Sequence, residues 1–390
     1  MKNNISNPLH ILSSLVRAKS IDEISPFDAK NIDELYSLSI NHGVANQINS
    51  NLTDFLSKEK KIVENTQQLS SLTQLNIKLT TFAQHSKVIS TITDNAAKNF
   101  LLALAEAEIK VVVLKGFSLG YQVYKTSYLR PKTDVDILIR NEDKRRISEI
   151  FVNLGYSNPR GWEPQAINNQ FSMKKMLSKG VSTLFDVHLK ISNSKQIENI
   201  LNYDELLISA NSTQLTNINL INKPYALIHA IFHLLHHKSS GDLIKLIWHY
   251  DLYLITKQLN ETELVQLKEL IKSKGLSNLV QYTLTLTANY LPTNELQHLI
   301  EWCNTSEITK TYQPQYDYLL GRTLGIKGVW LTLCATEGLS NKVAIIQEMV
   351  FPPAEEIYIK YGKDSGWPLV MLYIRRIFTG SIKYIFKKKK

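Results

Sequence analysis

Apolar residues recur at helical spacing through the first part of the chain, which is otherwise rich in Asn, Ser and Gln. Ser25-Pro26 is typical of a helix start, and Asn41-His42-Gly43 is typical of a helix end. Residues 1–95 are therefore expected to form an N-terminal helical region, and no motif in it indicates chemistry. The same periodicity predicts further helices over residues 45–57, 60–86 and 87–107.

The pattern changes at Ile109, where short β-branched runs replace the helical spacing. Val111–Leu114 and Val135–Ile139 are typical of buried strands, and Ser182–Leu189 alternates as a third strand does. A helix is expected between the second and third strands, over Asn141–Leu154. From Pro224 onward helical spacing returns, and it predicts helices at about 223–237, 241–258, 261–274, 276–290, 294–302, 315–335, 355–362 and 367–386.

These patterns predict an α+β fold, with a small mixed β-sheet core flanked by helical regions on both sides. The expected division is an N-terminal helical region (1–95), a core (96–220) and a C-terminal helical domain with a basic tail (221–390). A chain of 390 residues is long enough for two or three domains that each bury a core.

The strongest candidate for chemistry is a pair of aspartates in the second predicted strand. Because strand side chains alternate between faces, Asp134 and Asp136 point to the same side. Two carboxylates this close repel each other unless a cation lies between them, which makes the pair a candidate metal site. The third predicted strand places Asp186 and His188 on one face as well.

A glycine turn precedes this strand. Gly116 ends the first predicted strand and lets the backbone approach a ligand, and the following helix N-terminus offers free N–H groups to an anion. Mg²⁺ is usually held by few carboxylates together with substrate phosphates. These parts suit nucleoside triphosphate chemistry, in which metal ions activate a hydroxyl and stabilise the charge on phosphorus.

With these motifs the sequence resembles the nucleotidyltransferase superfamily, specifically a bacterial group of uncharacterised nucleotidyltransferases related to polymerase-β-like enzymes. The resemblance covers most of the chain after about residue 95. It is carried by Leu114-Lys115-Gly116, Tyr121, Tyr124, Arg130, Asp134–Ile139, Phe185–His188, the His233–His237 and Trp248–Leu252 stretches, and Phe351-Pro352 with Tyr361-Gly362.

The resemblance implies a role for each site residue. Asp134 and Asp136 bridge the metals, while Asp186 completes the nucleophile-side metal and serves as general base towards an acceptor hydroxyl. Gly116 and Ser118 cradle the phosphates, with Lys115 as a point charge. Arg130 either braces the loop or approaches the triphosphate, and a salt bridge within the domain is the alternative interpretation.

One departure from the relatives concerns the phosphate turn. Better-characterised relatives begin it with Gly-Ser, whereas here Lys115-Gly116 is followed by Phe117, and Ser118 is the nearest hydroxyl. The expected function is Mg²⁺-dependent, or Mn²⁺-dependent, transfer of an NMP group from an NTP to a hydroxyl of a small molecule, a protein or an RNA end, with release of pyrophosphate. The departure leaves open an inactive nucleotide- or partner-binding scaffold, and a toxin-type enzyme that modifies tRNA is a third interpretation.

The formal charge of +10 is concentrated at the C-terminus. Seven basic and no acidic residues lie between Arg375 and Lys390, which leaves +3 for the rest of the chain. This tail is interpreted as a solvated end, with weak contact to an anionic membrane surface or binding to RNA as alternatives. Nucleic acid is not favoured, because the 18 tyrosines are scattered rather than grouped into a stacking platform.

Four histidines cluster in the first helix after Pro224. His229, His233 and His237 share a helical face, with His236 beside them. Helix packing, contact with a substrate, and a metal site are the three interpretations of the cluster.

Localisation is predicted from what the sequence lacks. It has no N-terminal apolar stretch typical of a signal peptide and no run of about 20 apolar residues. Its two cysteines, Cys303 and Cys334, form no disulfide framework. A cytoplasmic location is expected.

Overall fold

The computed structural model describes residues 7–18, 20–59, 67–159, 169–305, 317, 319–320, 326–362 and 368–386. Its centre is a mixed six-stranded sheet with strand order β3-β4-β2-β1-β6-β5. The α+β class predicted from the sequence is confirmed. The strands are β1 (Val111–Val113), β2 (Val135–Leu138), β3 (Gln170–Ser178), β4 (Val181–His188), β5 (Asn211–Ser212) and β6 (Ile218–Leu220).

The sequence predicted three of these strands and missed the others. β3 lies in a stretch rich in Lys and Ser, so it has no apolar run, yet it pairs with β4 along almost its whole length. β5 and β6 are only two and three residues long, too short to show an alternation. The three strands that the sequence predicted are neighbours in the sheet, with β1 antiparallel to β2 and β2 parallel to β4.

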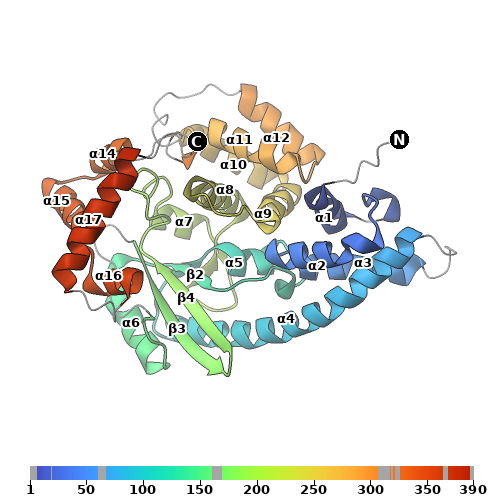
Figure 1. Ribbon diagram of the computed structural model, residues 1–390, viewed down its shortest axis with the longest axis horizontal. Coiled ribbons are helices and arrows are strands. Elements are labelled where there is room, and N and C mark those ends of the chain that lie inside the picture. Colours follow the sequence, from blue (N-terminus) through green and yellow to red (C-terminus); the bar gives the residue numbers. More distant parts are fainter. Residues whose placement is uncertain are drawn as a thin grey trace.

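The two faces of the sheet contact separate apolar cores. Val111, Val113, Ile137 and Phe185 belong to one core, into which α4 (Gln67–Glu106) and α6 (Lys144–Asn153) pack. Val112 and Leu138 face the other way, into a larger core to which helices before and after the sheet contribute. Figure 1 shows α4 along one side of the sheet and α8 (Lys223–Ser240) on the other. Because aspartates alternate with the apolar residues of β2, they share the second face.

Helix α4 is longer than expected. The predicted break between residues 86 and 87 is wrong, since the segment contains no glycine or proline to end the helix. One half of α4 packs with α2 and α3, and its last turns pack under the sheet. The predicted boundary at residues 95 and 96 lies inside this helix, and the division into domains stays a prediction. The other N-terminal helices are α1 (Pro8–Arg17), α2 (Ile32–Asn41) and α3 (Ala45–Glu59).

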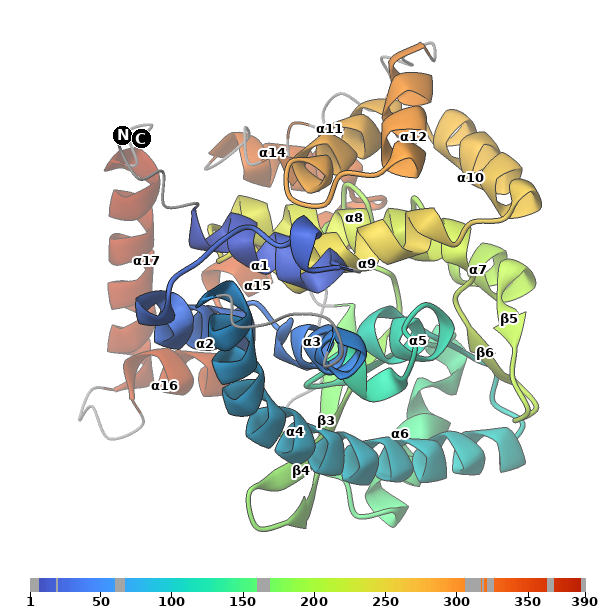
Figure 2. The same ribbon diagram turned by 90° about the vertical axis from the view of Figure 1, so that its right-hand side faces the viewer.

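The helices after the sheet cover its aspartate-bearing face, as Figure 2 shows for α8 and α9 above α5. α8 begins with Asn222, which caps the Tyr225 N–H, followed by Pro224, and it ends at Gly241 in the left-handed conformation. The helices after α8 are α9 (Leu246–Lys257), α10 (Glu261–Ser273), α11 (Ser277–Ala288) and α12 (Asn294–Thr305), while α5 (Lys115–Gln122) and α7 (Tyr203–Ser209) lie between strands.

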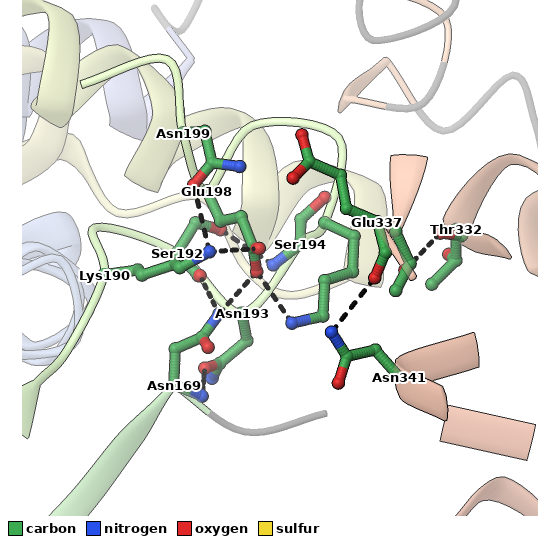
Figure 3. A network of polar contacts seen from close by, with 12 residues as sticks. Asn169, Lys190, Ser192, Asn193, Ser194, Glu198, Asn199, Thr332, Glu337 and Asn341 are labelled. Atoms are coloured by element: carbon green, nitrogen blue, oxygen red, sulfur yellow. Dashed lines mark hydrogen bonds and ion pairs between the residues drawn. The ribbon is translucent and has the colours of Figure 1, made fainter. Parts of the chain in front are cut away.

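Four further helices follow at the C-terminal end. A polar network in the loop after β4 contacts the first of them, α14 (Figure 3): the buried Glu198 carboxylate accepts from Lys190 and Asn169, and Gln196 donates to Thr332 of α14 at 3.1 Å. No helix among the described residues is long and apolar enough to cross a membrane. The four are α14 (Ile326–Ala335), α15 (Leu339–Val350), α16 (Ala354–Tyr361) and α17 (Leu369–Phe386).

Candidate functional site

The register of β2 and β4 brings the predicted acidic residues together. Asp136 pairs directly with Asp186 across the two parallel strands, and Asp134 lies two residues before Asp136 on the same face. Asp136 is 2% exposed, so its charge needs compensation from the protein.

Two side chains provide that compensation at a single oxygen of Asp136. The Lys115 ammonium lies 2.5 Å from Oδ1, and His188 Nε2 donates to the same oxygen at 2.8 Å. Although burial alone would raise the pKa of Asp136, the Lys115 charge and the His188 hydrogen bond hold it well below its usual range. Asp136 is therefore ionised, and the positive charge that stabilises it is the Lys115 ammonium of the protein itself.

Lys115 reaches Asp136 from a strained backbone position. It is the first residue of α5, and its φ of 47° lies in the left-handed region that non-glycine residues seldom adopt. Burial opposes its charge, but Asp136, Asp134 and Asp186 together raise the pKa of the ammonium. All three carboxylates thus act on one lysine.

The other two carboxylates differ in their surroundings. Burial, followed by the charge of Asp136, raises the pKa of Asp134 to about 6. Asp186 accepts a hydrogen bond of 2.6 Å from the hydroxyl of Ser172, its neighbour on β3. Because the pKa of Asp134 is raised, a cation bound beside it would favour its ionised form.

Arg130 is held by a carboxylate of the helical region. Its guanidinium makes a bidentate pair with Asp251 of α9, with Nη2 to Oδ2 at 2.8 Å and Nε to Oδ1 at 2.9 Å. The Tyr124 hydroxyl donates to the same carboxylate at 2.6 Å. A Cβ on Gly116 would lie 3.3 Å from Nη1 of Arg130, so glycine is the residue that this close approach accommodates.

These groups border a cavity of about 460 Å³ between the sheet and the helical region. This volume is within the usual range for a small-molecule site. Five of the seven predicted site residues line it, namely Lys115, Gly116, Arg130, Asp134 and Asp136.

The structure does not bring Ser118 to this cavity. The residue is fully buried, and its hydroxyl accepts a hydrogen bond of 2.7 Å from Gln122 on the same helix. Asp186 is not in the cavity lining either, although it lies beside Asp136 in the sheet. The predicted role of Ser118 in holding phosphate has no support from this position.

The helix α8 forms the opposite wall with three of its four clustered histidines. His229, His233 and His237 line the cavity, and the His237 ring stacks on Trp248 with centroids 4.5 Å apart. Burial, and next the Lys115 charge, lowers the pKa of His229 to about 3 and that of His233 well below its usual value. This wall is therefore aromatic and uncharged where it faces Lys115. His236 is outside the lining.

A metal ion has to fit this arrangement of carboxylates. Among the described residues no group of three His, Cys, Asp or Glu side chains is placed to hold one ion. Asp134 and Asp136 both face the cavity, however, and Mg²⁺ is commonly held by one or two carboxylates plus phosphate oxygens of its substrate. The donor set fits a Mg²⁺ that arrives with a nucleotide, and it does not fit a preformed three-carboxylate site.

Several contacts of the site had weak or no sequence signals. The His188 side chain pairs with Asp136 of the neighbouring strand, although the sequence only placed it on one strand face with Asp186. Asp251 lies in the Trp248–Leu252 stretch, for which the sequence predicted no contact with the aspartates, and the structure places it in the cavity lining. No spacing rule relates Ser172 to Asp186, because they come from two strands joined by a turn.

Comparison with known families gives the class of protein. Residues 28–292 match the family described as "Uncharacterised nucleotidyltransferase", which is about two thirds of the chain. The chain belongs to this nucleotidyltransferase family. No curated protein matches it.

Proposed function

We propose that the protein transfers an NMP group from an NTP to a hydroxyl acceptor, with Mg²⁺ or Mn²⁺ as cofactor. The observation that carries this proposal is the placement of Asp134 and Asp136 at the edge of a cavity that also receives the start of α5. Family membership supports the class of reaction. The acceptor is a small molecule, a protein side chain or an RNA end.

Several residues of the site have separate roles in binding the NTP donor. Lys115 offers its ammonium to the triphosphate, and the first N–H groups of α5 add the partial positive charge of a helix N-terminus. Arg130 acts as the brace of this turn, because Asp251 already occupies its guanidinium. Asp134 and Asp136, together with phosphate oxygens of the substrate, would hold the metal, which would neutralise charge at phosphorus.

Asp186 is proposed as the proton acceptor for the attacking hydroxyl. It lies next to Asp136 on the paired strand, and Ser172 fixes one of its oxygens. The other oxygen remains the one able to receive a proton.

The test is incubation with each of the four NTPs, labelled at the α-phosphate, with Mg²⁺ and an extract as the source of acceptors. Label transferred to an acceptor, with release of pyrophosphate, is expected for the wild type. D134A/D136A is expected to lower the rate at least about a thousandfold, because both carboxylate ligands are lost. Transfer at the wild-type rate by this variant would contradict the proposal.

A second candidate function is nucleotide binding without turnover. The Lys115–Asp136 ion pair favours it, because the ammonium lies on the carboxylate that a metal would need. Under this alternative an NTP binds equally well with and without divalent metal, and D134A/D136A leaves its affinity unchanged. Isothermal titration with and without Mg²⁺ distinguishes the two functions.

A further inference from the structure

Helix α17 exposes a stripe of large apolar side chains to solvent. Val370, Ile374 and Ile377 follow one another at helical spacing, with Met371 beside them, and all four are at least 40% exposed. We call these four residues the α17 stripe. An exposed apolar row of this kind is typical of a surface that binds another protein or a membrane.

The opposite face of α17 is already occupied by the protein. Leu372 is fully buried, the Tyr373 hydroxyl donates to the Pro352 carbonyl, and Arg376 Nη2 donates to the Met349 carbonyl at 3.3 Å. Figure 2 shows α17 at one edge of the molecule. These contacts orient the helix, so the stripe faces outward.

The neighbouring helices expose apolar residues in the same way. Leu339, Val343 and Ile346 form an exposed row on α15, and Trp330 of α14 is 64% exposed. From residue 326 to 377 the described large apolar side chains are more often exposed than buried. This segment lies after the residues that match the family, so the surface belongs to a part of the chain that the family match does not include.

Charge identifies the kind of partner. The sequence from residue 365 to the end has seven basic and no acidic residues, and Arg375 is exposed next to the stripe. The apolar stripe combined with the excess of basic residues in this C-terminal segment matches a bilayer surface of anionic phospholipid, where the apolar residues enter the headgroup boundary and the basic residues meet phosphates. No described helix can span a bilayer, so the contact is with its surface.

We propose that the α17 stripe docks the protein on an anionic phospholipid surface. The experiment is co-sedimentation of the full chain with vesicles of phosphatidylcholine alone, or of phosphatidylcholine and phosphatidylglycerol in equal parts. The protein binds the mixed vesicles and not the neutral ones, and high salt weakens the binding. I374D/I377D lowers the apparent affinity about tenfold or more, because two apolar side chains no longer enter the bilayer.

The matched control is V265D, which adds an acidic residue at an exposed valine of α10. It retains vesicle binding, and circular dichroism shows that all variants remain folded. Equal loss of binding in V265D and I374D/I377D, or no binding by the wild type, overturns the proposal. Two other outcomes also overturn it: a wild-type dimer that I374D/I377D dissociates, which assigns the stripe to a second copy, and RNA binding that the same variant abolishes while vesicles are ignored.

Discussion

Lys115 provides the positive charge that the aspartate pair requires. Asp136 is buried and Asp134 is partly buried on the same strand face, so ionising both carboxylates costs free energy. The Lys115 ammonium beside Asp136 lowers that cost. Its left-handed backbone conformation carries a free-energy cost of roughly 1–3 kcal/mol, which a side chain without function would not justify. The lysine is therefore the residue whose replacement should change the site most directly.

Replacing Lys115 by methionine tests this role. K115M leaves Asp136 buried with only His188 as partner, and the free energy of unfolding should fall by about 2–4 kcal/mol without metal. Because the carboxylates then lack their internal cation, millimolar Mn²⁺ should recover part of the loss. Urea unfolding with and without Mn²⁺ measures both effects. K115M/D136N is the control, and it should show no recovery; a K115M protein as stable as the wild type would refute the role.

The raised pKa of Asp134 predicts a dependence of stability on pH. Its pKa of about 6 exceeds the ordinary 3.8, so the folded state binds this proton more tightly than the unfolded chain. Ionising Asp134 therefore costs the folded state free energy, and its contribution to stability falls as pH rises from about 4 to about 6. Histidines with a lowered pKa, such as His229, make the folded state more stable as pH rises. The contribution of Asp134 is therefore measured as a difference between the wild type and a variant.

Comparing the wild type with D134N isolates the effect of Asp134. The two proteins should have the same free energy of unfolding near pH 4. Near pH 7 the free energy of unfolding of D134N should be higher by about 1–2 kcal/mol, after allowance for solvent screening. Urea denaturation at a series of pH values measures it. A difference that stays constant with pH would show that Asp134 has no raised pKa.

Between elements, the Arg130–Asp251 pair joins the turn before β2 to helix α9. Both side chains are almost fully buried, so R130M leaves an uncompensated carboxylate with only Tyr124 as donor. The free energy of unfolding should fall by about 3–5 kcal/mol, measured by urea denaturation. R130M/D251L, which removes both charges, should lose much less.

An exposed ion pair supplies the control for this prediction. Lys125 lies 3.0 Å from Asp54, with both side chains more than half exposed. K125M should therefore change the free energy of unfolding by less than about 1 kcal/mol. A similar loss in K125M and R130M would mean that burial does not set the strength of these pairs.

The same elements explain how far the sequence could predict the fold and the site. Strand alternation placed Asp134 and Asp136 on one face, because that periodicity is a local property of the chain. The partners of those groups are not local: Lys115 and Asp136 are 21 residues apart, and Arg130 and Asp251 are 121 apart. Such contacts depend on how helices pack over the sheet, which no residue spacing encodes. Ser118 illustrates the limit, since a suitable hydroxyl near the turn faces the protein interior.

For the whole molecule, the cavity lies between two parts of the fold that differ in composition. One wall comes from the sheet and α5 and carries Asp134, Asp136 and the Lys115 ammonium. The other comes from α8 and α9 and carries histidine and tryptophan rings, and its Asp251 is neutralised by the pair with Arg130. A nucleotide has the same division between phosphates and base. A ligand that contacts both walls should stabilise the entire chain, because it binds the folded state alone.

This argument predicts that an NTP with Mg²⁺ raises the free energy of unfolding by about 2.7 kcal/mol at one hundred times its dissociation constant. It also predicts a change in tryptophan fluorescence, since Trp248 is the tryptophan that lines the cavity among the described residues. W248F should lose the fluorescence change and retain the stabilisation, whereas W302F should retain both, because Trp302 on α12 lies outside the lining. If W302F instead loses the signal and W248F keeps it, the nucleotide binds elsewhere, and the cavity between the two walls is not its site.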